Sequence, residues 1–180
     1  FPGLRKLIDP KGAACAKRIA AVARAAAEPG EKIITKADYL RQAEDFLYNY
    51  RPNLRRWNEE FYDYNSGAYR PVTHDEISSD VYRFLDRARI QTDEGLVAAR
   101  KTRNAVGEIL SASVAVPNVL IDKETQPPIW LDGRSEPDPK DLLVCRNSVL
   151  SMRTRKLIDA TPALFCLNRL EIDYDPAAQS

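Results

Sequence analysis

The chain has 180 residues, 44% of them hydrophobic, which is enough to bury the core of one domain with a small appendage. Its 27 lysines and arginines nearly balance 26 aspartates and glutamates, so the net charge is +1. That balance excludes a generally basic nucleic-acid-binding chain, and any contact with nucleic acid would need a local basic patch.

The sequence shows no targeting segment. No stretch of 18 apolar residues is present, and FPGLRKL at the start lacks the long apolar run of a signal peptide. We therefore expect a cytoplasmic protein with no membrane partner. The chain begins with Phe1 instead of Met and stops soon after Tyr174-Asp175-Pro176, so we expect it to be a piece of a longer protein.

The spacing of cysteine and histidine does not favour a metal site. Cys15, Cys145 and Cys166 are far apart and form no Cys-x-x-Cys pair, and His74 is the only histidine. A zinc site built from these residue types is therefore not expected. The three thiols are interpreted as small buried side chains in a reducing compartment.

The first 52 residues are predicted to form a helical segment or linker, with helices at about 10–28 and 35–50. The first helix is rich in alanine, the residue with the highest helix propensity. The second helix is predicted to start at Thr35, which would be its N-cap, with Asp38 three residues later in the capping-box position. Residues 53–180 are predicted to form the main domain.

The stretch Arg56–Ala88 predicts a β-hairpin followed by an amphipathic helix. Asn65-Ser66-Gly67 supplies the turn, because asparagine and glycine tolerate positive φ, and Ala68–Val72 is the returning strand. Thr73 and Glu76 then have the spacing of a capping box. In the helix, at 74–89, the apolar residues that share one stripe are Ile77, Val81, Phe84, Leu85 and Ala88.

A further helix is predicted at Thr92–Val114, because acids follow Thr92 and apolar residues recur at helical spacing. After Pro117 the sequence has only short apolar runs separated by turn residues. These runs predict strands at 142–145, 149–152, 156–158 and 167–172. The fold class is therefore α+β, with a mostly helical N-terminal half that contains a β-hairpin and small antiparallel β elements in the C-terminal half.

Two blocks of sequence resemble a known family. The first block runs from Leu54-Arg55-Arg56-Trp57 through Phe61-Tyr62 and Tyr69-Arg70 to Val81-Tyr82-Arg83-Phe84-Leu85. The second, at 142–178, contains Asn147, Thr161-Pro162, Asn168-Arg169-Leu170 and Tyr174-Asp175-Pro176. Together they are similar to the domain that precedes the superfamily 3 helicase in phage, plasmid and poxvirus DNA primase-helicases, and the resemblance covers roughly 54–178.

Three positions depart from the family pattern. Ser148 stands where a glycine usually follows the asparagine, and Arg155 stands where a turn glycine is common. Ala160 replaces the histidine that often precedes Thr-Pro, so any role of that histidine in relatives is absent here. We expect the two turns to be kept in altered form.

The resemblance implies a function for the chain and for a longer parent protein. The chain would be a non-catalytic module of a phage, prophage or plasmid replicative primase-helicase, placed between a priming domain and the helicase motor. The parent protein would be a hexamer, and its motor would lie downstream and require ATP and Mg²⁺. Partners of the module would then be the adjacent primase and helicase domains, and single-stranded or forked DNA.

No catalytic residue, metal ligand or cofactor site is assigned within the chain. It contains no G-x-x-x-x-G-K-[ST] phosphate loop. Asp173 and Asp175 flank Tyr174 on one side of an extended segment, which either holds a divalent metal or is a polar exit from the domain. His74 beside Asp75 is either an acid/base pair or an exposed start of a helix.

Basic and aromatic residues give three candidate groups for binding nucleic acid. Alternation in the hairpin places Trp57 and Phe61 on a core face, and Tyr62 and Tyr64 on a face that could stack bases. Arg83 and Arg87 share a helix face, and further bases follow. The full candidate set is Arg55, Arg56, Tyr62, Tyr64 and Arg70 in the hairpin, Arg83, Arg87, Arg100, Lys101 and Arg103 in the middle, and Arg146, Arg153, Arg155 and Lys156 at later turns.

Each group also has an ordinary structural interpretation. The aromatic side chains could simply cover the helix, and charged helix faces are commonly only solvated. Two other classes of function also stay open, a stand-alone DNA-binding regulator with a winged-helix-like arrangement and a purely structural spacer. A regulator should bind a defined duplex and dimerise, whereas a helicase module should prefer single strands or forks and lose affinity steeply with salt.

Overall fold

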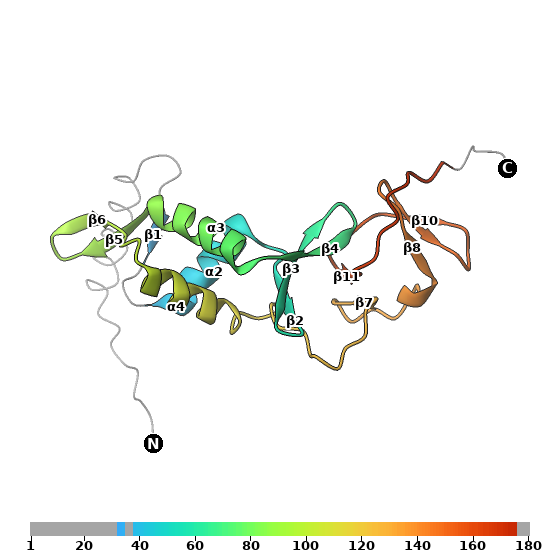
Figure 1. The fold of residues 1–180 in the computed structure, drawn as a ribbon, viewed down its shortest axis with the longest axis horizontal. Helices are drawn as coiled ribbons and strands as arrows, with labels where there is room; N and C mark the ends of the chain where they lie inside the picture. Colours follow the sequence, from blue (N-terminus) through green and yellow to red (C-terminus); the bar gives the residue numbers. More distant parts are fainter. Residues whose placement is uncertain (1–31, 35–37, 176–180) are drawn as a thin grey trace, which may run out of the picture.

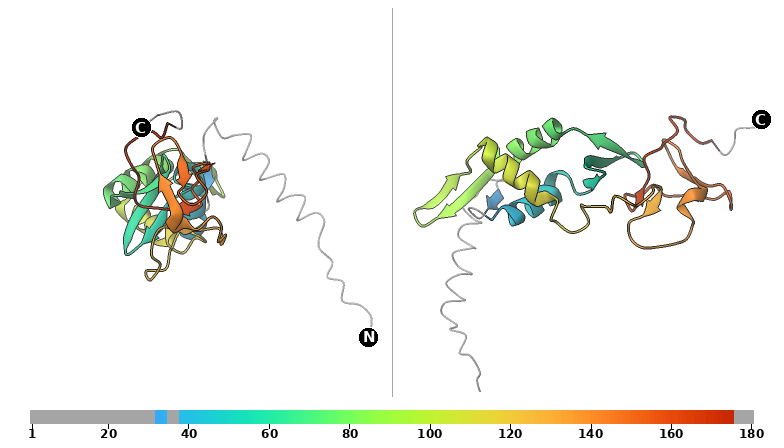
Figure 2. Two further views of the ribbon diagram at one scale, coloured as in Figure 1. Left: turned by 90° about the vertical axis from the view of Figure 1, so that its right-hand side faces the viewer. Right: turned by 60° about the horizontal axis from the view of Figure 1, so that its bottom comes forward.

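The computed structural model describes residues 32–34 and 38–175, and the predicted α+β class is confirmed there. The predicted helix at about 10–28, Cys15 and the proposed cap Thr35 lie outside the described residues. The described part is elongated, with helices and one small sheet at one end, a second sheet in the middle, and short β pieces at the other end (Figures 1 and 2).

Three helices share the larger hydrophobic core. They are α2 (Tyr39–Tyr50), α3 (His74–Asp86) and α4 (Arg103–Ser113). The capping box predicted at Thr73 and Glu76 is present, with both reciprocal hydrogen bonds formed at the start of α3. All four apolar residues of the predicted stripe that lie within α3 are buried. Because α2 packs with α3 and α4, the predicted segments 1–52 and 53–180 meet in one core.

The start of α2 differs from the prediction. Its N-cap is Asp38, whose carboxylate accepts a hydrogen bond from the Arg41 N–H, and the helix begins at Tyr39. Asp38 therefore caps the helix itself and is not the third residue of a capping box that starts at Thr35. An aspartate at this place is among the best N-caps, and it satisfies one of the free N–H groups of the first turn.

The predicted helix Thr92–Val114 is wrong over about its first half, because α4 (Arg103–Ser113) covers only the second half. After α3 ends at Asp86, the chain forms β5 (Ala88–Thr92) and β6 (Gly95–Ala98), which pair as a hairpin, and β1 (Lys32–Ile34) lies parallel to β5. Gly95 has a φ of +125°, a conformation that side chains disfavour, so the acids after Thr92 form a turn and not a first helical turn. α4 starts only at Arg103, with Thr102 as its N-cap.

The central sheet contains the predicted hairpin and one strand more. β3 (Glu60–Asn65) and β4 (Ala68–Val72) pair across a turn at Ser66-Gly67, as predicted. β2 (Arg55–Trp57) adds a third strand through a two-residue turn at Asn58-Glu59, whose φ angles of 47° and 68° are both positive. This turn interrupts the alternation assumed from Trp57 to Tyr64.

The assignment of Trp57 and Phe61 to one face is therefore wrong. Phe61 packs against the helical core, whereas Trp57 contacts Tyr62 and Phe165 in a separate aromatic cluster. The reverse turn between them changes which side of the sheet each residue faces, because Trp57 pairs with Glu60 across the turn.

The far end of the molecule is a small β lobe. β8 (Leu142–Val144), β9 (Val149–Ser151) and β10 (Leu157–Ile158) form an antiparallel sheet, as predicted, and η1 (Pro139–Asp141) precedes it. β7 (Ile129–Trp130) pairs with β11 (Leu164–Phe165). The strand predicted at 167–172 is wrong: this segment makes only two separated backbone hydrogen bonds to the lobe, from Leu170 to Val144 and from Arg146 to Ile172.

The helical end and the central sheet are joined by the guanidinium of Arg51, the residue that follows α2. Its Nη1 donates to Asp63 Oδ2 at 2.9 Å on β3, while Nε and Nη2 donate to Asp80 Oδ2 at 2.8 and 2.5 Å on α3. Burial works against the charge of Arg51, but the hydrogen bonds to Asp63 and Asp80 outweigh it and raise the pKa of the guanidinium. One cation thus fixes a helix end, a strand and a second helix.

Replacing Glu59 with glycine is expected to raise the free energy of unfolding by about 0.5–1 kcal/mol, because Asn-Gly is the favoured pair where both turn residues have positive φ. Urea denaturation at neutral pH measures the change. The matched control is Glu60→Gly in β3, which should lower stability by a similar amount, since glycine weakens a strand. A loss of stability in both variants would contradict the role given to this turn.

Arg51→Met is expected to lower the free energy of unfolding by about 2 kcal/mol, because Asp63 and Asp80 lose a partly buried partner. Arg83→Met is the matched control. It removes the other partner of Asp80, but the Arg83 side chain is 70% exposed, so the loss should be at most about 0.5 kcal/mol. Equal losses in the two variants, measured by urea denaturation, would show that Arg51 is not the joint between these elements.

Candidate nucleic-acid interface

Five of the predicted basic residues lie where α3 ends and α4 begins. This basic corner consists of Arg83, Arg87, Arg100, Lys101 and Arg103, and all five are exposed. Lys101, in the segment that leads into α4, donates from its Nζ to Asp86 Oδ1 at the end of α3, at 2.5 Å. This contact brings the segment that leads into α4 to the end of α3, so exposed cations from both helices and from the linking segment lie near this end of α3.

The charge at the basic corner is only partly compensated. The hydrogen bond from Lys101 lowers the pKa of Asp86, and the nearby charges of Lys101, Arg87 and Arg89 add to this effect. At least three cations thus act on one carboxylate. Arg83 pairs with Asp80 at 2.9 Å, and Asp63 and Asp80 together balance Arg51 and Arg83, so the remaining positive charge of the corner comes from Arg87, Arg100 and Arg103. An excess of positive charge is left at this end of α3.

The tyrosines predicted to stack bases face other protein groups. Tyr62 is 8% exposed, packs on Trp57 and Phe165, and donates its hydroxyl hydrogen to Glu60 at 2.9 Å. Tyr64 is half-buried against Tyr69, with ring centroids 5.5 Å apart. The hairpin rings therefore form part of the aromatic cluster that connects the central sheet to the β lobe, an arrangement that leaves little ring surface for a base.

The arginines of the central sheet also make internal contacts. Arg55 is half-buried and donates to the carbonyl of Leu54 at 2.8 Å. Arg56 lies over the ring of Phe61 at 5.3 Å, and Arg70 forms an ion pair with Glu171 at 2.7 Å. These three residues lie apart from the basic corner and do not add to its exposed charge.

The third predicted group lies in the β lobe, at the opposite end of the described molecule from the basic corner (Figure 1). Arg146 holds both carboxylate oxygens of Asp173 at 3.0 Å, which raises the pKa of the arginine. Arg153 binds Glu136 at 2.8 Å and lies 3.4 Å from Asp141. Arg155 and Lys156 are exposed on the following turn. Two of these four cations therefore have acidic partners, whereas the other two face solvent.

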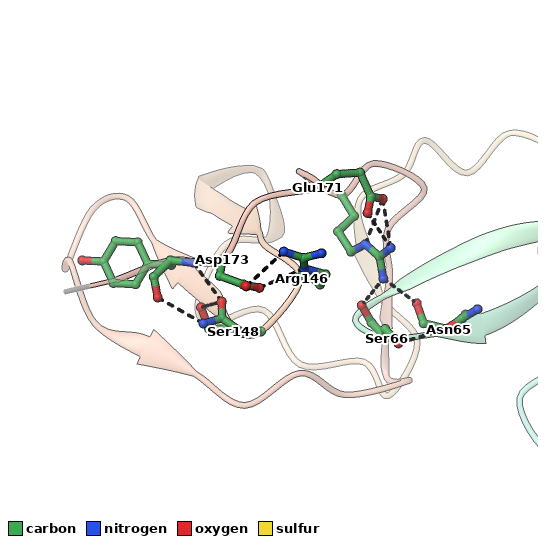
Figure 3. A network of polar contacts seen from close by, with 9 residues as sticks. Asn65, Ser66, Arg146, Ser148, Glu171 and Asp173 are labelled. Carbon is green, nitrogen blue, oxygen red and sulfur yellow. Dashed lines mark hydrogen bonds and ion pairs between the residues drawn. The ribbon is translucent and has the colours of Figure 1, made fainter. Parts of the chain in front are cut away.

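A polar network that the sequence did not indicate attaches the last described segment to this lobe (Figure 3). The Asn147 side chain donates to the Tyr174 carbonyl at 3.1 Å and accepts from the Tyr174 N–H at 2.9 Å. Arg169, with a side chain only 13% exposed, donates to the Ser66 carbonyl at 2.9 Å and binds Glu171. The one available signal was that Asn147 and Tyr174 both belong to the motifs that carry the family resemblance.

This network also accounts for one feature singled out in the sequence. Asp173, considered as a metal ligand, is the ion-pair partner of Arg146. Across the described ranges, no group of three or more histidine, cysteine or acidic side chains is arranged to hold a metal ion.

Arg155, which stands at a common glycine position, has a φ of 57°, so the turn keeps a left-handed residue without the glycine. Cys145 and Cys166 are buried free thiols.

Comparison with known proteins gives no assignment. Neither a protein-family model nor a curated protein matches the chain. Among the residues that the structure describes, no helix is both long and apolar enough to cross a membrane.

The most buried tyrosine gives a test of the aromatic cluster. Burial raises the pKa of Tyr69 to about 12, above the ordinary value of about 10, and its hydroxyl donates to the Pro162 carbonyl at 2.6 Å. A raised folded-state pKa means that this contribution to stability is complete below about pH 10 and is lost as the pH rises toward 12. Titration of tyrosine absorbance, followed with circular dichroism, should show a late step that coincides with unfolding.

Tyr69→Phe should remove one tyrosine from that late step. Ionisation of all eight tyrosines near pH 10 in a chain that still gives the folded circular-dichroism spectrum would contradict the buried position of Tyr69.

Proposed function

We propose that this chain is a non-catalytic module of a phage, prophage or plasmid replicative primase-helicase, and that it contacts DNA through the basic corner. The assignment to a primase-helicase rests on the resemblance over roughly 54–178. The contact with DNA rests on one observation, the excess of exposed positive charge where α3 ends and α4 begins. In this role the module lies between a priming domain and a superfamily 3 motor, and it positions the strand relative to that motor.

The chemistry of the corner suits a sugar-phosphate backbone. Arginine and lysine on a fixed surface neutralise successive phosphates and release counterions, which gives binding that is sensitive to salt and tolerant of sequence. A replication module needs this combination, because it must follow any template sequence. ATP and Mg²⁺ belong to the motor of the parent protein, in which six copies of the module would form a collar.

The polar network in the β lobe supports the same role. Asn147 and Tyr174 come from the middle and the end of the second family-like block, and they bind each other by a reciprocal pair of hydrogen bonds. The pairing fixes the direction of the chain as it leaves the lobe. In a larger protein, such a fixed exit would set the orientation of the following domain.

One feature of the topology supports the alternative, a winged-helix-like regulator. The β5–β6 hairpin follows α3 as a wing follows a recognition helix. The charge of the hairpin is against it. Its turn carries Asp93 and Glu94, both exposed, and acids at the tip of a wing repel DNA phosphates. We therefore place the DNA contact at the basic corner and not at the hairpin.

The proposal predicts salt-sensitive binding of labelled single-stranded or forked DNA, measured by fluorescence anisotropy at low and moderate salt. Arg87→Glu/Arg100→Glu should weaken binding at least about tenfold at low salt and lower the salt slope by about 1 to 1.5, as expected for two lost phosphate contacts. Arg155→Glu/Lys156→Glu is the matched control, because it makes the same change in charge in the β lobe.

The outcomes separate the possible functions. An equal loss in both double variants would indicate an effect of net charge alone, and a loss only in the control would move the contact to the β lobe. Preference for one duplex sequence, with dimerisation, would favour the regulator. Absence of binding to any DNA at low salt would leave a spacer whose partners are proteins.

A further inference from the structure

A groove runs between α3 and α4 beside the basic corner, with a volume of about 510 Å³. Arg103 belongs to both features, since it lines the groove and is one of the five exposed cations of the corner. The other residues that line the groove are His74, Asp75, Ser78, Tyr82, Asn104, Val106, Gly107, Glu108 and Leu110. The groove therefore opens next to the surface where the sugar-phosphate backbone would lie.

Two features leave room in this groove for a flat ring. Tyr82 lines the groove and is 38% exposed, so it is not buried in the core. Gly107 of α4 also lines the groove, and a Cβ atom added there would meet no atom within 4 Å. An exposed aromatic ring beside basic residues is the combination with which proteins hold single-stranded nucleic acids, because every base has a face that can stack.

The polar groups that line the groove favour a base over a phosphate as its ligand. Asp75 and Glu108 line it along with Arg103, so a phosphate inside the groove would meet two carboxylates. Carboxylates accept hydrogen bonds from the amino groups of cytosine, adenine and guanine, whereas thymine has no amino group and offers only its ring N3–H as a donor. His74 and Ser78, whose Nδ1 and Oγ atoms are 3.3 Å apart, and Asn104 supply further polar contacts.

We propose that one unpaired base of a single strand enters the α3–α4 groove and stacks on Tyr82, while its flanking phosphates lie on the basic corner. This inference rests on the proposed function and specifies its ligand. It requires an unpaired base, because a base held in a duplex cannot leave its partner without a cost in pairing and stacking. It also gives the contact a preference for the bases that carry an amino group over thymine.

The test compares three labelled strands of equal length by fluorescence anisotropy: oligo-dC, oligo-dT and an abasic strand. The chain should bind oligo-dC several-fold more tightly than oligo-dT, and both more tightly than the abasic strand. Tyr82→Ala should weaken binding to oligo-dC about tenfold and leave the abasic strand unaffected, as expected when one stacked base is lost. Tyr82→Phe keeps the ring and should bind as the original chain does.

Gly107→Leu is a second variant that fills the groove without weakening the helix, because leucine has a higher helix propensity than glycine. It should reproduce the loss seen with Tyr82→Ala. Tyr48→Ala is the matched control, since Tyr48 lies on α2 and is 82% exposed. The affinity of the Tyr48→Ala variant for oligo-dC should not change.

The result that overturns the inference is distinct from the one that overturns the proposed function. Unchanged affinity in Tyr82→Ala and Gly107→Leu, with the abasic strand bound as tightly as oligo-dC, would show that no base enters the groove. If Arg87→Glu/Arg100→Glu still weakened binding, the phosphate contact would stand alone. Absence of binding to all three strands at low salt would remove both proposals.

Discussion

The arrangement of this protein depends on the ion pairs of Arg51. A single guanidinium at the end of α2 binds Asp63 on the central sheet and Asp80 on α3, so two helices and a strand meet at one cation. Hydrophobic contacts are not directional, and they would allow α3 to rotate or slide against the core. The planar fork of an arginine does not allow this, because its donors must face both carboxylates. This joint fixes the position of α3. The position of α3 in turn sets where the basic corner and the groove lie.

The charged residues divide into two populations with different roles. In the β lobe, several arginines bind carboxylates, as Arg146 binds Asp173 and Arg169 binds Glu171, and these pairs hold segments that have almost no regular secondary structure. At the basic corner, cations outnumber the acids near them. A chain with a net charge of +1 thereby acquires a locally positive surface. This separation of paired from excess charge is what makes one end of the molecule suitable for a polyanion.

Local sequence signals predicted the elements whose stability is local. The capping box of Thr73 and Glu76 and the turn at Ser66-Gly67 form as expected, because their hydrogen bonds or φ angles involve residues only a few positions apart. The helix predicted from Thr92 is wrong because the helical spacing of its apolar residues was compatible with a hairpin. Pairing of β5 with β6 and with the distant strand β1 decided between the helix and the hairpin. No local window of sequence around Thr92 contains β1.

The sequence by itself determined the α+β class, the position and cap of α3, the β3–β4 hairpin and the strands β8, β9 and β10 of the β lobe, since periodicity and turn chemistry are written along the chain. It also identified the basic residues, but not which of them gather. Only the tertiary structure decided that Arg87 and Lys101 meet at Asp86, that Tyr62 is buried, and that Tyr82 and Gly107 line a common groove. The physical reason is that burial and the excess of charge at a point are properties of residues brought together from distant parts of the chain, and folding alone sets those distances.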